Sequence, residues 1–186
     1  MGDPRPVDGG FLMRNKWTDP HDLTNLQKLI GRKVQHIHMD EDYLVFRCSD
    51  GTVAVCGCWG DCCSYSYFQD FIGVEKLLES DVVLAVEEIP LPHDHLPYLR
   101  KDSESVEAYG FRITSEHPTF GDVSSVFSFR NDSNGYYGGW LESLSEPPDP
   151  LPPEITTDVL TTEDLAQVLI PADAATLLNR CTDGAE

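Results

Sequence analysis

The feature that most constrains the fold is a period-two alternation of apolar and polar side chains in the first third of the chain. Such alternation is typical of strands that bury one face. Two acidic turns, Asp40-Glu41 and Asp50-Gly51, interrupt it, and Asp-Gly is a strong signal for a tight hairpin. The sequence therefore predicts an antiparallel meander of three strands, at about residues 33–39, 42–48 and 52–58.

The two turns also predict which side chains share a face of this meander. If each loop has two residues, one face carries only apolar side chains, because strand side chains alternate strictly between the two faces. His36 and His38 then lie on the opposite face, together with Cys56 and Cys58. We expect the apolar face to be buried; it comprises Ile37, Leu44, Phe46, Cys48, Val53 and Val55.

The centre of the chain predicts a helix and then further strands. Phe68, Phe71 and Leu78 belong to an apolar stripe that suits a helix at about residues 65–78. Asn134-Gly135 predicts a hairpin between the last two of four later strands, at about 81–89, 104–114, 122–130 and 136–142. The expected fold class is α+β: a mostly antiparallel sheet of six to seven strands, one packed central helix and a short helical C-terminal segment.

Composition divides the chain into four segments. Residues 1–32 are expected to form an N-terminal arm and a short helix, and residues 33–145 the α+β core domain. Residues 146–153 read Glu-Pro-Pro-Asp-Pro-Leu-Pro-Pro, which is typical of a stiff extended linker. Residues 154–186 are expected to form a helical C-terminal segment.

The strongly acidic composition limits the possible partners. The chain has 32 Asp and Glu against 13 Lys and Arg, a formal net charge of −19. Such a surface repels nucleic-acid backbones, so direct nucleic-acid binding is not expected, and a protein with a basic surface is the expected partner.

No apolar run approaches the roughly 18 residues of a membrane span, and the N-terminus does not resemble a secretory signal. We expect a cytoplasmic protein without a membrane partner.

Cysteines provide the first candidate for a chemical site. Cys56, Cys58, Cys62 and Cys63 lie close together in the sequence, and thiolates are good zinc ligands. Their spacing is not that of two C-x-x-C pairs, and cysteine is commonly a buried packing residue. We therefore expect no cofactor, with zinc as the alternative.

A cysteine nucleophile is a second possibility, centred on Asp61, Cys62 and Cys63. These residues precede the expected helix at 65–78, and the positive end of a helix lowers the pKa of a thiol. Asp61 is more simply interpreted as a capping residue that accepts backbone N–H groups. The chain has no Walker loop, dinucleotide fingerprint, H-E-x-x-H or G-x-S-x-G motif. We therefore favour a protein that is not an enzyme.

Aromatic residues beside glycines indicate a recognition surface. Exposed aromatic side chains are common at binding sites, and glycines allow a ligand or a packed neighbour to approach the backbone closely. The binding candidates are Trp59, Asn134, Tyr136, Tyr137 and Trp140.

Three motifs in fixed order give a resemblance to a known family. They are Trp-Gly-Asp-Cys-Cys-Ser at 59–64, Gly-Val-Glu-Lys-Leu-Leu at 73–78 and Ser-Asn-Gly-Tyr-Tyr-Gly-Gly-Trp-Leu at 133–141. Over about residues 33–143 the chain resembles an uncharacterised family of small proteins from bacteriophages and bacteria. The resemblance implies no activity or cofactor, but it implies a phage or accessory gene product that modulates a host component.

The leading hypothesis is therefore a non-enzymatic, acidic protein-interaction module, in its specific form a phage-type modulator or inhibitor of a host or defence component. One alternative is a small cysteine-centred enzyme or zinc-binding protein that uses Asp61, Cys62 and Cys63. A further alternative is a DNA mimic, since negative charge can imitate a phosphate backbone.

Overall fold

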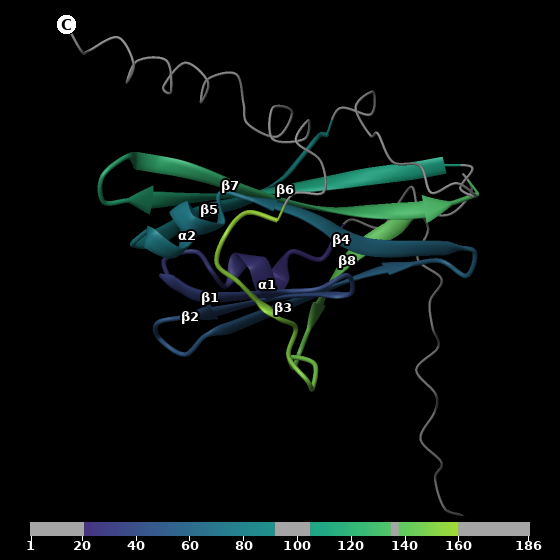
Figure 1. The fold of residues 1–186 in the computed structure, drawn as a ribbon, viewed down its shortest axis with the longest axis horizontal. Coiled ribbons are helices and arrows are strands. Elements are labelled where there is room, and N and C mark those ends of the chain that lie inside the picture. The colour runs from purple at the N-terminus through teal and green to yellow at the C-terminus, as the bar shows by residue number, and fades with distance from the viewer. Residues whose placement is uncertain (1–20, 92–104, 135–137, 160–186) are drawn as a thin grey trace, which may run out of the picture.

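The computed structural model describes residues 21–91, 105–134 and 138–159, which form two antiparallel β-sheets packed face to face (Figure 1). The strands are β1 (Val34–Met39), β2 (Tyr43–Cys48), β3 (Val53–Gly60), β4 (Ser64–Ile72), β5 (Val82–Ile89), β6 (Ser105–His117), β7 (Gly121–Ser133), β8 (Gly139–Leu144) and β9 (Glu154–Ile155). The helices are α1 (Thr24–Gln27) and α2 (Val74–Glu79). One sheet has the order β8-β3-β2-β1-β9 and the other β4-β7-β6-β5.

The expected α+β class is wrong, because the described part of the chain is nearly all β-structure. The helix expected at residues 65–78 is instead β4 followed by the short helix α2. A β-bulge between Phe68 and Asp70 explains the error. The extra residue makes Phe68 and Phe71, three positions apart, face the same side, which imitates helical spacing. Gly73, with a φ of 79°, then separates β4 from α2.

The three-stranded meander is confirmed, but both of its turns differ from the prediction. In the first turn Met39 pairs with Leu44 and not with Asp42, a shift of two residues that leaves the same side chains on each face. The second turn differs by one residue. The backbone bonds Gly51 N–H to Cys48 O and Cys48 N–H to Thr52 O enclose a three-residue loop, in which Gly51 has a φ of 86°. The additional loop residue shifts the register of β3 by one. Val53 and Val55 therefore lie on the opposite face of the sheet, where Val53 is exposed and Val55 is still buried, while Ala54, Cys56 and Cys58 join Ile37, Leu44, Phe46 and Cys48 in the core.

The hairpin predicted at Asn134-Gly135 is also wrong. β7 pairs with β4 and β6, whereas β8 pairs with β3 in the other sheet. The chain therefore crosses from one sheet to the other between these two strands. It crosses in the same way between β3 and β4, which also lie in different sheets.

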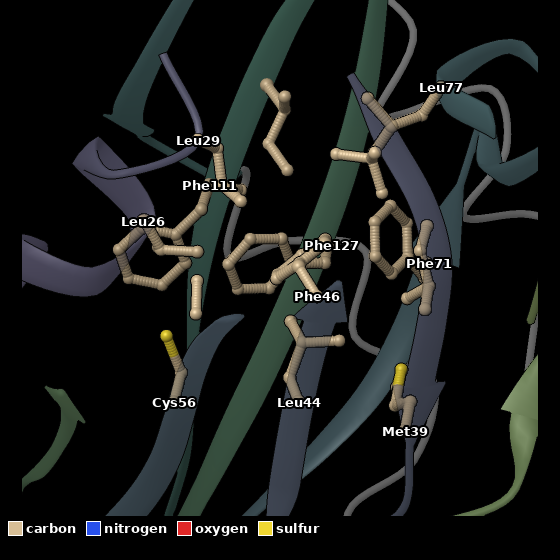
Figure 2. Close-up of a cluster of buried hydrophobic side chains, with 14 of the residues drawn as sticks. Leu26, Leu29, Met39, Leu44, Phe46, Cys56, Phe71, Leu77, Phe111 and Phe127 are labelled. Carbon is tan, nitrogen blue, oxygen red and sulfur yellow. The ribbon is translucent and has the colours of Figure 1, made fainter. Parts of the chain in front are cut away.

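Aromatic rings fill the space between the sheets. Phe46 of β2 contacts Phe71 and Phe127 of the opposite sheet, at centroid distances of 6.0 and 6.4 Å. Phe111 stacks on Phe127 at 5.1 Å. All four rings are completely buried, and each contributes about 2–3 kcal/mol through the hydrophobic effect. Figure 2 shows these rings with aliphatic side chains from the sheets and both helices.

Residues 154–159, which we name the C-terminal clasp, join the edges of both sheets. Ile155 pairs with Ile37 of β1, and Val159 exchanges two backbone hydrogen bonds with Phe71 of β4, at 2.8 and 2.9 Å. The Asp158 carboxylate accepts the N–H groups of Gly73 and Val74 at the start of α2, at 2.8 and 2.9 Å. The preceding proline-rich segment runs beneath the five-stranded sheet from β8 to β9 (Figure 1). The helical structure expected beyond residue 159 lies outside the described residues.

We expect Asp158→Ala to lower the free energy of unfolding by about 1 kcal/mol, as loss of a helix cap typically does. The substitution leaves two N–H groups at the start of α2 without their acceptor. Urea denaturation measures the change. Asp122→Ala, which removes an equal charge from an exposed position in β7, is the matched control and should change stability by less than about 0.5 kcal/mol. Equal effects of both variants would contradict the capping role.

Candidate functional site

The structure separates the four clustered cysteines into two unlike pairs. Cys56 and Cys58 lie on the inner face of β3, and burial raises the pKa of both thiols. The Cys58 thiol donates a hydrogen bond to the carbonyl oxygen of Glu41 at 3.4 Å. These two thiols are packed in the core, whereas Cys62 and Cys63 are exposed in the turn between β3 and β4.

The turn that carries Cys62 and Cys63 has no helix beside it. Ser64 opens strand β4, so the helix end that was expected to activate these thiols is not there. The backbone carbonyl oxygen of Asp61 closes the turn by accepting the N–H of Ser64 at 2.9 Å. The hydrogen bond that the two thiols share, and then the charge of Cys62, raise the pKa of the Cys63 thiol. Within residues 21–91, 105–134 and 138–159, no three His, Cys, Asp or Glu side chains are grouped to hold a metal ion.

Glycines of the first and third motifs mark the place where the chain crosses between the sheets. Gly60 and Gly139 are opposite each other in the β3–β8 ladder. A Cβ atom on Gly139 would lie only 2.9 Å from the Cβ of Asn131 and would also collide with the Ser66 hydroxyl. Ser66 donates a hydrogen bond to Asn131 at 3.0 Å. Packed neighbours therefore explain the close backbone approach that these glycines allow.

The predicted binding residues are placed as follows. Trp59 and Trp140 are direct neighbours across β3 and β8, and Trp59 is 39% exposed. Asn134 follows β7 and is exposed. Tyr136 and Tyr137 lie outside the described residues.

Further aromatic residues, which sequence reasoning missed, flank an acidic turn between β1 and β2. Tyr43 contacts Trp59 edge to face, at a centroid distance of 6.5 Å. Tyr65 stacks on Tyr67 at 5.5 Å, and its hydroxyl donates to the Glu41 carboxylate at 3.0 Å. We name this surface the aromatic–acidic corner; it comprises Asp40, Glu41, Asp42, Tyr43, Trp59, Tyr65 and Tyr67.

Backbone contacts fix the acidic turn against both sheets. The N–H of Phe68 in β4 donates to the carbonyl oxygen of Glu41 at 2.8 Å, and the N–H of Cys58 in β3 donates to that of Asp42 at 3.3 Å. The Asp40 carboxylate accepts the N–H groups of Asp42 and Tyr43 within the turn. Partial burial, and then the charges of Asp40 and Glu41, raise the pKa of Asp42. The corner is thus a rigid surface with concentrated negative charge.

A buried ion pair lies on the outward face of the four-stranded sheet. Asp70 of β4 and Arg130 of β7 are 3.0 Å apart, and Ser128 donates to the same carboxylate oxygen at 3.2 Å. Their side chains are only 0% and 3% exposed. Loss of one partner would leave a buried charge uncompensated, so we assign this group to the stability of the sheet.

His21 is largely enclosed at one end of the space between the sheets, with a side chain that is 9% exposed. Its ring contacts Tyr109, Phe111 and Phe129 edge to face, and its Nδ1 accepts the N–H of Leu141 at 3.1 Å. Burial lowers the pKa of His21 from 6.5 to about 4. The neutral ring is therefore the form that the fold stabilises.

This shift predicts a pH-dependent stability. The folded pKa lies below the unfolded value, so the contribution is fully present above pH 6.5 and is lost as the pH falls towards 4. We expect the free energy of unfolding to decrease by up to about 3 kcal/mol across this window through His21 alone. Urea denaturation of the wild type and of His21→Gln, measured as a function of pH, tests this. Parallel pH profiles of the two proteins would contradict the assignment.

The fold and the site define a two-sheet antiparallel sandwich with a rigid aromatic and acidic surface. The family model described as Domain of unknown function (DUF7448) matches residues 27–142, and the chain belongs to this family. This confirms the expected membership of an uncharacterised domain family. No curated protein and no solved structure matches the chain. None of the helices in the described ranges has the length and apolar character that crossing a membrane requires.

Proposed function

We propose that the protein is a non-enzymatic binding module that recognises a basic segment of another protein through the aromatic–acidic corner. The observation that carries the proposal is the pairing of exposed aromatic rings with a fixed acidic turn. Trp59 and Tyr65 are each 39% exposed, and the Tyr65 hydroxyl is bound to Glu41.

Arginine-rich segments fit the chemistry of this surface best. Guanidinium groups stack on aromatic faces and form paired hydrogen bonds with carboxylates, and the corner presents both kinds of group side by side. Because backbone bonds already fix the acidic turn, a partner would bind it with little further loss of conformational entropy. The net charge of −19 would also accelerate the encounter with a basic partner.

The specific form that we favour is a phage-type modulator or inhibitor of a host or defence component. The three ordered motifs, with their resemblance to proteins of bacteriophages and bacteria, support this setting. The strongly acidic composition supports it as well, because it favours binding to a basic surface over binding to nucleic acid.

Binding of a labelled arginine-rich peptide to the full chain, measured by fluorescence anisotropy, tests the proposal. We expect the double variant Glu41→Gln/Trp59→Ala to bind at least about tenfold more weakly, since contacts of this kind contribute about 1–2 kcal/mol. Affinity should also fall as the salt concentration rises.

The matched control is Asp122→Asn/Phe120→Ala at the turn between β6 and β7. It removes the same charge and one exposed aromatic ring, and Phe120 is 67% exposed. This turn lies at the opposite end of β7 from Asp132, which pairs with Tyr65 of the corner. A control variant that weakens binding as much as the corner variant would attribute the binding to net charge and overturn the proposal.

A further inference from the structure

Two exposed thiols meet at the tip of the β3–β4 turn. The Sγ atoms of Cys62 and Cys63 are 3.7 Å apart, and one thiol donates a hydrogen bond to the other. Both residues are exposed. We name them the vicinal thiol pair. Neither belongs to the core or to the aromatic–acidic corner, although Trp59 lies near the end of β3 and Tyr65 near the start of β4, on either side of the turn.

The distance between these sulfur atoms matches one edge of a metal-thiolate tetrahedron. A Zn–S bond is about 2.3 Å long, so two thiolates on one tetrahedral zinc ion have their sulfur atoms about 3.8 Å apart. A disulfide would instead require the sulfur atoms to approach to about 2.05 Å, and the Cα separation of neighbouring residues, which the peptide bond fixes at about 3.8 Å, is shorter than the roughly 4.4–6.8 Å usual for disulfides. The pair therefore suits a bridging ion better than a covalent bond.

The short turn holds the two thiols in this arrangement. Ser64 donates both its N–H, at 2.9 Å, and its hydroxyl, at 3.1 Å, to the carbonyl oxygen of Asp61. These two bonds close the chain around Cys62 and Cys63. Strands β3 and β4, on either side, are each paired within a different sheet, which limits how far the turn can open.

We propose that Cys62 and Cys63 form a binding site for a thiophilic divalent cation, such as Zn²⁺ or Cd²⁺, held by both thiolates. Binding displaces one proton from each thiol, so two protons are released for each ion bound. Water completes the coordination in the isolated chain, because no third His, Cys, Asp or Glu is grouped with the pair among the described residues. The open positions are free to accept ligands from a partner.

Titration of the reduced, metal-free full chain with Cd²⁺ tests the site. The thiolate-to-metal absorption band reports binding through sulfur, native mass spectrometry gives the stoichiometry, and a pH indicator counts the released protons. All proteins carry Cys181→Ser, which removes the thiol that lies outside the described residues. Cys62→Ser and Cys63→Ser, made singly, each leave one exposed thiol as the matched control.

We expect one Cd²⁺ per chain, two protons released, and affinity about a hundredfold lower in either single variant, because the second thiolate binds intramolecularly. One ion for every two chains, again lost in both single variants, would also support the site and would assign the open positions to a second copy. Unchanged affinity in either single variant would overturn the proposal. The readouts do not involve the basic peptide, so the proposal stands or falls separately from the proposed function.

Discussion

The contact between phenylalanine rings from the two sheets is the interaction on which the rest of the structure depends. Phe46 comes from β2, whereas Phe71 and Phe127 come from β4 and β7 of the other sheet. Both sheets must therefore be complete before either is stable, because each provides the other's apolar cover. The chain crosses between the layers near Gly60 and Gly139, and the crossing near Gly60 leads into β4, which lies beside the acidic turn.

The strands could be predicted where alternation and turn residues lie close together in the sequence. β1 and β2 were recognised because alternation and turn residues both lie within a few positions, and Ile37, Leu44 and Phe46 are buried as expected. β4 could not be recognised, because its bulge gives Phe68 and Phe71 a helical spacing. The register of β3 was missed because Asp50-Gly51 fits a loop of two or of three residues, and only the completed ladder distinguishes them.

The candidate site was less predictable than the fold, because its residues come from separate elements. Trp59 was identified from its own motif, but Tyr43, which contacts it, and the exposed Tyr65 were not. The alternation of Tyr65 and Tyr67 with Ser66 and Phe68 was the available signal, and it was obscured by the helical interpretation of that segment. The contact between Tyr65 and Glu41 spans 24 positions, so no local pattern could have indicated it.

The C-terminal clasp has a consequence for how the domain should be delimited. The family match ends at residue 142, within β8, whereas the clasp at 154–159 covers one edge of each sheet. Exposed strand edges are templates for pairing between molecules. A fragment cut at the end of the family match would expose the outer edges of β1 and β4 together. We expect such a fragment to self-associate by pairing strands between molecules. The smallest fragment that remains monomeric therefore extends past the family boundary to Val159.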